Sequence, residues 1–211
     1  MGFGIIFIGY LFTVFDMGFI VNEALLVFVC KILTVIGYTV LLFGLYKFSR
    51  YSQFAKYSFY ATVALDAAMI FEAVIQGLWF FKIMSEQTMV NIRFYLFTVI
   101  AVLFALSQVL LFYAVFDMGR QTECEKVRKN GIRSVAATGA FCILNIAASL
   151  PIALGNIIDF IRYALFVVVT VINAVTLYSA YRYICLDTEL EAEQAEALKA
   201  RTFKKDKNNG A

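Results

Sequence analysis

Histidine is missing from this chain of 211 residues, and proline occurs only once. Without histidine the chain lacks the commonest general base and the commonest metal ligand, and no Gly-x-Ser-x-Gly elbow supplies a serine nucleophile. The four cysteines (Cys30, Cys124, Cys142 and Cys185) form no close pair, which excludes a Cys-x-x-Cys redox motif and a zinc knuckle. We therefore expect no enzyme, no catalytic or metal-binding residues and no cofactor.

Charge is also scarce. Charged residues make up 16% of the chain, whereas they make up about a quarter of an ordinary soluble domain. The net charge of +3 is too small, and its basic residues too scattered, to indicate a nucleic-acid partner. What is present instead is 62% hydrophobic residues and a mean hydropathy of +0.80. This composition predicts an integral membrane protein, with the lipid bilayer as its first partner.

Long apolar runs predict how often the chain crosses the bilayer, because one helical crossing needs about 20 mostly apolar residues. Six runs reach or approach that length: residues 3–21, 24–46, 58–81, 94–116, 132–154 and 160–184. The first run is the weakest because Asp16 interrupts it, and the prediction falls to five spans if this run stays at the membrane interface. The predicted fold is an all-α, polytopic membrane bundle over residues 1–185.

The charged segments outside these runs predict shorter elements. Thr122 and Glu125 have capping-box spacing and Gly131 is typical of a helix stop, so a short helix or an extension of the fourth span is expected there. Residues 186–203 are predicted as a short cytoplasmic helix that opens with a second capping box. Residues 204–211 are predicted as a disordered basic tail.

The distribution of basic residues predicts the orientation. Lysine and arginine gather in the second connection, in the fourth connection and in the C-terminal tail, all on one side of a six-span bundle. The other side receives Lys82, Arg93 and Arg162. Because basic loops are retained in the cytoplasm, we expect both termini to be cytoplasmic and the protein to lie in the plasma (inner) membrane.

Three ionisable residues, Lys31, Asp66 and Glu72, fall inside the predicted spans. A charge at mid-bilayer costs at least about 2.5 kcal/mol unless it is paired, hydrated or functional. The second span and the third run in opposite directions, which puts Lys31 and Glu72 at comparable depth, and we expect them to pair. Glu72 shares a helix face with Gln76, while Asp66 lies on another face. The pair is either a structural clasp or part of a solute or ion site.

The fifth span carries the longest polar stripe, with side chains three or four positions apart on one helix face. The stripe consists of Ser134, Thr138, Cys142, Asn145 and Ser149. It is expected to face protein or water. The small residues beside it are expected to permit a close helix approach; they are Ala136, Ala137, Gly139 and Ala140. Gln108 on the fourth span and Asn173 on the sixth add buried amides. These groups either join helices by hydrogen bonds or line a substrate path.

Two functions of different classes fit these features. The first is a non-enzymatic protein that binds or passes a small solute or ion through a polar interior around Lys31, Glu72 and Asp66. The second is a membrane-embedded accessory or scaffold subunit that holds another membrane protein or a second copy of this chain. A cavity reaching Lys31 and Glu72 would favour the first function, and a dry, fully paired core would favour the second.

Overall fold

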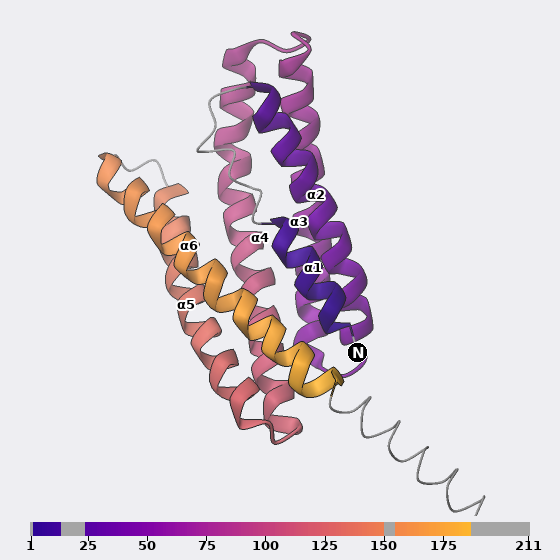
Figure 1. Ribbon diagram of the computed structural model, residues 1–211. Helices are drawn as coiled ribbons and strands as arrows, with labels where there is room; N and C mark the ends of the chain where they lie inside the picture. Colours follow the sequence, from indigo (N-terminus) through magenta and orange to yellow (C-terminus); the bar gives the residue numbers. More distant parts are fainter. Residues whose placement is uncertain (1, 14–23, 150–154, 187–211) are drawn as a thin grey trace, which may run out of the picture.

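The computed structural model describes residues 2–13, 24–149 and 155–186, and their secondary structure is helical (Figure 1). The helices are α1 (Phe3–Thr13), α2 (Ala24–Phe48), α3 (Gln53–Phe80), α4 (Glu86–Gln121), α5 (Glu125–Ser149), α6 (Gly155–Ala180) and the π-helix η1 (Tyr181–Leu186). Within these ranges, five helices are long and apolar enough to cross a membrane. The all-helical, multi-pass class predicted from the sequence is therefore confirmed. The predicted elements at 186–203 and 204–211 lie almost wholly outside the described residues.

The helices extend beyond the apolar runs that predicted them. α4 begins at Glu86, before the apolar run starts at Phe94, and its 36 residues amount to about 54 Å at 1.5 Å per residue. The side chain of Ser85 accepts a hydrogen bond from the backbone nitrogen of Thr88 at 3.3 Å and so caps this early start. Since a bilayer core is about 30 Å thick, α4 carries polar turns at both ends.

α1 is the element that departs most from a full span. Its 11 residues cover about 16 Å, roughly half of a bilayer core, and residues 14–21 of the predicted run lie outside the described ranges. The helix nevertheless starts at the end of the bundle where α2 turns into α3 (Figure 1). The first residues of α1 therefore lie beside the α2–α3 turn, although the helix itself is short.

α1 and α2 cross with their backbones almost touching. A Cβ added to Gly9 would lie 2.5 Å from the nitrogen of Leu41, and one added to Gly37 would lie 2.8 Å from the nitrogen of Thr13. Glycine is required here because any side chain would collide with the partner backbone. By contrast, a Cβ added to Gly139 would meet nothing within 4 Å, so Gly139 does not contribute to the close approach predicted for the small residues of α5.

The connection between α4 and α5 is shorter than the sequence suggested. α4 continues to Gln121, and the hydroxyl of Thr122 donates to the carbonyl of Met118 at 2.9 Å, closing α4 instead of capping the next helix. Glu125 is the first residue of α5, which runs through Gly131 without a stop. A Cβ at Gly131 would lie 2.7 Å from the Cα of Phe116. The glycine permits close packing of α4 and α5 and does not end a helix.

The bundle is closed at one end and splayed at the other (Figure 1). The closed end carries the α2–α3 and α4–α5 turns and the last turn of α6, and we call it the basic end because Lys47, Arg50 and Arg120 lie there. Towards the opposite end, which we call the far end, α5 and α6 lean away from α2, α3 and α4 (Figure 1). This divergence creates the space in which the candidate site lies.

Candidate binding cavity between the helices

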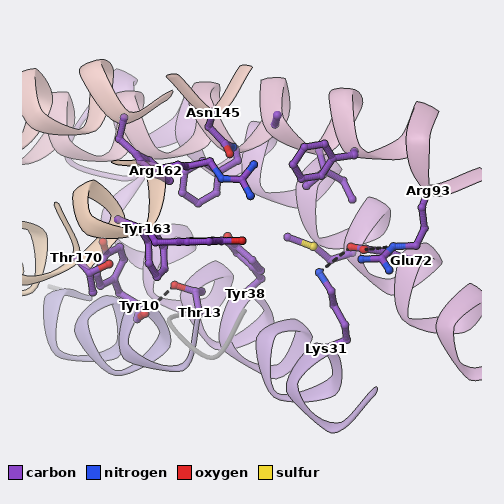
Figure 2. Close-up of a pocket in the computed structure, with 17 residues that line it drawn as sticks. Tyr10, Thr13, Lys31, Tyr38, Glu72, Arg93, Asn145, Arg162, Tyr163 and Thr170 are labelled. Carbon is purple, nitrogen blue, oxygen red and sulfur yellow. Dashed lines mark hydrogen bonds and ion pairs between the residues drawn. The ribbon is translucent and has the colours of Figure 1, made fainter. Parts of the chain in front are cut away.

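A cavity of about 170 Å³ lies between the diverging helices, and its lining takes residues from each of α1 to α6. Figure 2 shows three groups of side chains around it. Lys31, Glu72 and Arg93 lie at one side, while Tyr10 and Thr170 lie at the opposite side (Figure 2). Arg162, Asn145 and Tyr163 lie between these two sides (Figure 2). No two helices alone could form this lining, so the cavity is a product of the whole bundle.

The charged side of the cavity is built around Glu72. Lys31 Nζ lies 3.0 Å from Glu72 Oε2, and Arg93 Nε lies 3.5 Å from Glu72 Oε1. The side chains of Lys31 and Glu72 are 10% and 8% exposed, whereas that of Arg93 is 40% exposed. The ion pair predicted between Lys31 and Glu72 is present, and a third residue joins it. Both carboxylate oxygens of Glu72 are engaged by cations.

Three cations of the lining lie at a similar depth in their helices. Lys31, Arg93 and Arg162 each stand seven positions after the first residue of α2, α4 and α6, which is about 10 Å along a helix. The guanidinium of Arg162 lies 5.3 Å from the ring centre of Tyr163 and 6.0 Å from that of Phe97, within cation–π range. Sequence reasoning had placed Arg93 and Arg162 on the outer side and missed their part in the cavity.

Three aromatic rings form an apolar wall of the same cavity. The ring of Phe141 on α5 lies 6.1 Å from that of Phe104 on α4, edge to face, and 5.7 Å from that of Phe166 on α6. These spacings are typical of favourable aromatic contacts. All three rings line the cavity, together with Met69 of α3. The cavity thus has a charged side and an apolar wall.

The polar stripe of α5 divides between two roles. Towards the basic end, Ser134 donates to the hydroxyl of Thr176 at 2.7 Å, and Thr138 donates to Asn173 Oδ1 at 3.2 Å. These bonds join α5 to α6. Towards the far end, α5 and α6 lean away from α2, α3 and α4, and Asn145 lines the cavity. Ser134 and Thr138 thus face protein and Asn145 faces the cavity, while the side chain of Ser149 lies outside the described part of the chain.

Asn173 connects the cavity to the closed half of the bundle. Its Nδ2 donates to the hydroxyl of Tyr10 at 3.0 Å, and Tyr10 lines the cavity. Asn173 itself is 2% exposed and is not part of the lining among the described residues. It holds α1, α5 and α6 together and fixes the position of the Tyr10 ring.

Three other candidate residues are buried away from the cavity: Asp66, Gln76 and Gln108. Asp66 Oδ2 accepts a hydrogen bond from the hydroxyl of Thr39 at 3.3 Å, which places this carboxylate in the seam between α2 and α3. Neither amide atom of the Gln108 side chain has a hydrogen-bond partner within the described part of the chain. The three residues predicted to form one polar interior therefore lie in two places. Lys31 and Glu72 lie at the cavity, and Asp66 lies between α2 and α3.

Comparison of the chain with protein-family models, with curated proteins and with solved structures gives no match. In the described ranges, no group of three histidine, cysteine or acidic residues is arranged to hold a metal ion.

Proposed function

We propose that this protein binds a small solute in its interhelical cavity, as a membrane protein without catalytic activity. The observation that carries the proposal is that the cavity reaches Lys31 and Glu72 and is lined by every helix from α1 to α6. A ligand held there would contact all parts of the bundle at once. Ligand sites are typically concave, mostly apolar and furnished with a few convergent polar groups, and this cavity has that character.

A purely structural role for the Lys31–Glu72 ion pair explains less of the cavity's geometry. An ion pair that only joined α2 to α3 would need Lys31 and Glu72, and it would be most stable in a closely packed surrounding. Here the pair borders open space, and Arg93 and Arg162 from two further helices line the same space. Keeping charges beside an open volume inside a membrane is expensive. A solute or water in this volume would offset that free-energy cost by interacting with the charges.

The proposal includes an orientation. Basic turns face the cytoplasm, so the basic end and both termini are cytoplasmic and the splayed far end faces outward. The solute would then enter from outside, while hydrogen bonds between α5 and α6 close the inner half. Passage through the bundle would require this hydrogen-bonded half to open. Binding from the outer side requires no such change.

Cysteine labelling of intact cells tests the orientation. In a cysteine-free background, Asn208→Cys should be protected from a membrane-impermeant thiol reagent. Ile83→Cys should react, because Ile83 is 73% exposed in the turn between α3 and α4 at the far end. The reverse pattern of labelling would invert the bundle.

A matched pair of cysteines on α5 tests the cavity. Asn145→Cys lies in the lining and should react with the impermeant reagent from outside. Thr138→Cys, seven positions earlier on the same helix, is 1% exposed between α5 and α6 and should be protected. Protection at both positions would mean a dry, closed interior, which would favour the accessory or scaffold subunit over the solute-binding protein.

A further inference from the structure

We infer that the solute is a small organic anion, a carboxylate on a compact aromatic or aliphatic body, with its charged group on Arg93 and its body against the Phe104, Phe141 and Phe166 wall. This inference rests on the proposed function and assigns the ligand class for the same cavity. It combines three features of the lining, namely its charges, its apolar wall and its size.

The charges favour an anion. Glu72 is the acidic side chain that the described lining contains, and it shares that lining with Lys31, Arg93 and Arg162. Lys31 and Arg162 have further interactions within the protein, so we assign the anion to Arg93. Its Nε lies 3.5 Å from Glu72 Oε1, its side chain is 40% exposed and it lines the cavity. An arginine presents five donors in a planar fork that matches a carboxylate.

The same geometry disfavours a cation. A metal ion or an ammonium group would need the Glu72 carboxylate as its counter-charge. One oxygen of that carboxylate lies 3.0 Å from Lys31 Nζ and the other lies 3.5 Å from Arg93 Nε. A cationic ligand would have to displace one of these partners and leave it uncompensated in a low-dielectric site. An anion requires no displacement, because it adds to donors already present.

The wall and the volume define the body of the ligand. The cavity measures about 170 Å³, close to the roughly 150 Å³ of an apolar protein cavity that holds benzene. The rings of Phe104, Phe141 and Phe166 offer edges and faces to an aromatic or short aliphatic group. A benzene ring with one carboxylate is the simplest probe that satisfies both the wall and Arg93.

Binding of three probes to the purified full-length protein tests this class. Benzoate, benzamide and benzylammonium share one ring and differ in charge, and each would be titrated at constant ionic strength while the thermal unfolding midpoint is measured. A ligand that binds the folded state raises this midpoint. Benzoate should raise it in a saturable manner, and benzamide and benzylammonium should raise it much less.

Variants of Arg93 test whether this residue is responsible for the benzoate response. Arg93→Gln should weaken the benzoate response about tenfold or more, because a charge-assisted hydrogen bond is lost. Arg93→Lys, which keeps the charge and loses the fork, should give an intermediate response. Arg133→Gln removes an exposed arginine near the basic end of α5 and should leave the response unchanged.

The possible outcomes test the anionic ligand class and the solute-binding cavity as two separate hypotheses. An equal response to benzamide, or a stronger one to benzylammonium, would overturn the anion and leave a solute-binding cavity. No response to any probe while Asn145→Cys is labelled would also overturn the anion class alone. No response with Asn145→Cys protected would overturn both the class and the proposed function. A benzoate response unaltered by Arg93→Gln would show that Arg93 does not hold the carboxylate.

Discussion

The two halves of this bundle use the same kinds of residue for different purposes. In the half at the basic end, α4 and α5 approach so closely that a Cβ on Gly119 would lie 2.7 Å from the nitrogen of Arg128. Polar side chains there bond to one another, as Asn130 does to Ser179 at 3.1 Å. In the far half the helices part, and the polar side chain of Asn145 borders a cavity.

The difference teaches that helix separation decides what a polar side chain does in a membrane bundle. Thr138 and Asn145 belong to one stripe on one face of α5. The hydroxyl of Thr138 bonds to Asn173 Oδ1 of α6 at 3.2 Å, whereas Asn145 lines the cavity in the half where α5 and α6 lean away from α2, α3 and α4. Both side chains are polar and uncharged, and what differs between the two positions is how far the surrounding helices lie from α5.

The largest effect is expected from breaking the charged cluster of the far half. Lys31→Met leaves Glu72 with one cation, and Glu72→Gln leaves the buried Lys31 without its carboxylate. Each should cost about 3–5 kcal/mol of the free energy of unfolding, and the double variant should recover part of that loss. A double-mutant cycle in bicelles measures the coupling. Purely additive losses would mean that the pair does not stabilise the far half.

The next effect concerns the crossing of α1 and α2. Gly9→Ala places a Cβ about 2.5 Å from the nitrogen of Leu41 and should cost roughly 1–3 kcal/mol. Gly139→Ala meets nothing within 4 Å and should be neutral or should gain up to about 1 kcal/mol from helix propensity. Denaturant titration in mixed micelles compares the two variants. Similar losses at both positions would contradict the packing difference.

A smaller effect should distinguish the hydrogen-bonded half from the cavity-lining half directly. Asn173→Leu removes bonds to Tyr10 and Thr138 and should cost about 0.6–1.7 kcal/mol, the range of such bonds in membrane proteins. Asn145→Leu should cost less stability and should instead abolish solute binding. Thermal unfolding with and without benzoate measures both quantities. If Asn145→Leu destabilised the protein as Asn173→Leu does, Asn145 would be a packing residue.

The smallest effect is expected on the surface of the basic-end half, at the exposed start of α5. Lys129 Nζ lies 2.7 Å from Glu125 Oε1, four positions apart on the helix, with both side chains more than half exposed. Surface pairs of this type contribute little because water and salt screen them. Lys129→Gln should leave the unfolding midpoint unchanged within experimental error, which supplies the baseline for the other variants. A clear loss would indicate a contact beyond this pair.

Much of the fold could be predicted because the bilayer imposes a length on each helix. The five longer runs correspond to α2 to α6, although each described helix begins or ends in polar residues beyond its run. The first run was harder to assign as a span, because its 11-residue apolar helix is shorter than the about 20 residues that one crossing needs. The glycines of its crossing carried a readable signal: Gly2 and Gly9 are seven apart, and so are Gly37 and Gly44.

The candidate site was predictable in part. Lys31 and Glu72 lie on consecutive antiparallel helices, so their depths follow from their positions in the chain, and they meet as expected. Asp66 was predicted to contribute to the same interior, yet it contacts Thr39 instead. Six positions along a helix rotate a side chain far from the face that Glu72 occupies. The helical period was visible in the sequence, but the location of the cavity was not.

The sequence by itself determined that this is a helical membrane protein, where its longer helices lie and which two charges meet between neighbouring helices. These properties follow from local rules of hydrophobic length, helical period and antiparallel connection. Only the tertiary structure decided that Arg93 and Arg162, on helices that are not consecutive, line the same cavity as Lys31 and Glu72. The physical reason is that a cavity depends on how far α5 and α6 lean from α2, α3 and α4, and that angle is set by packing across the whole bundle.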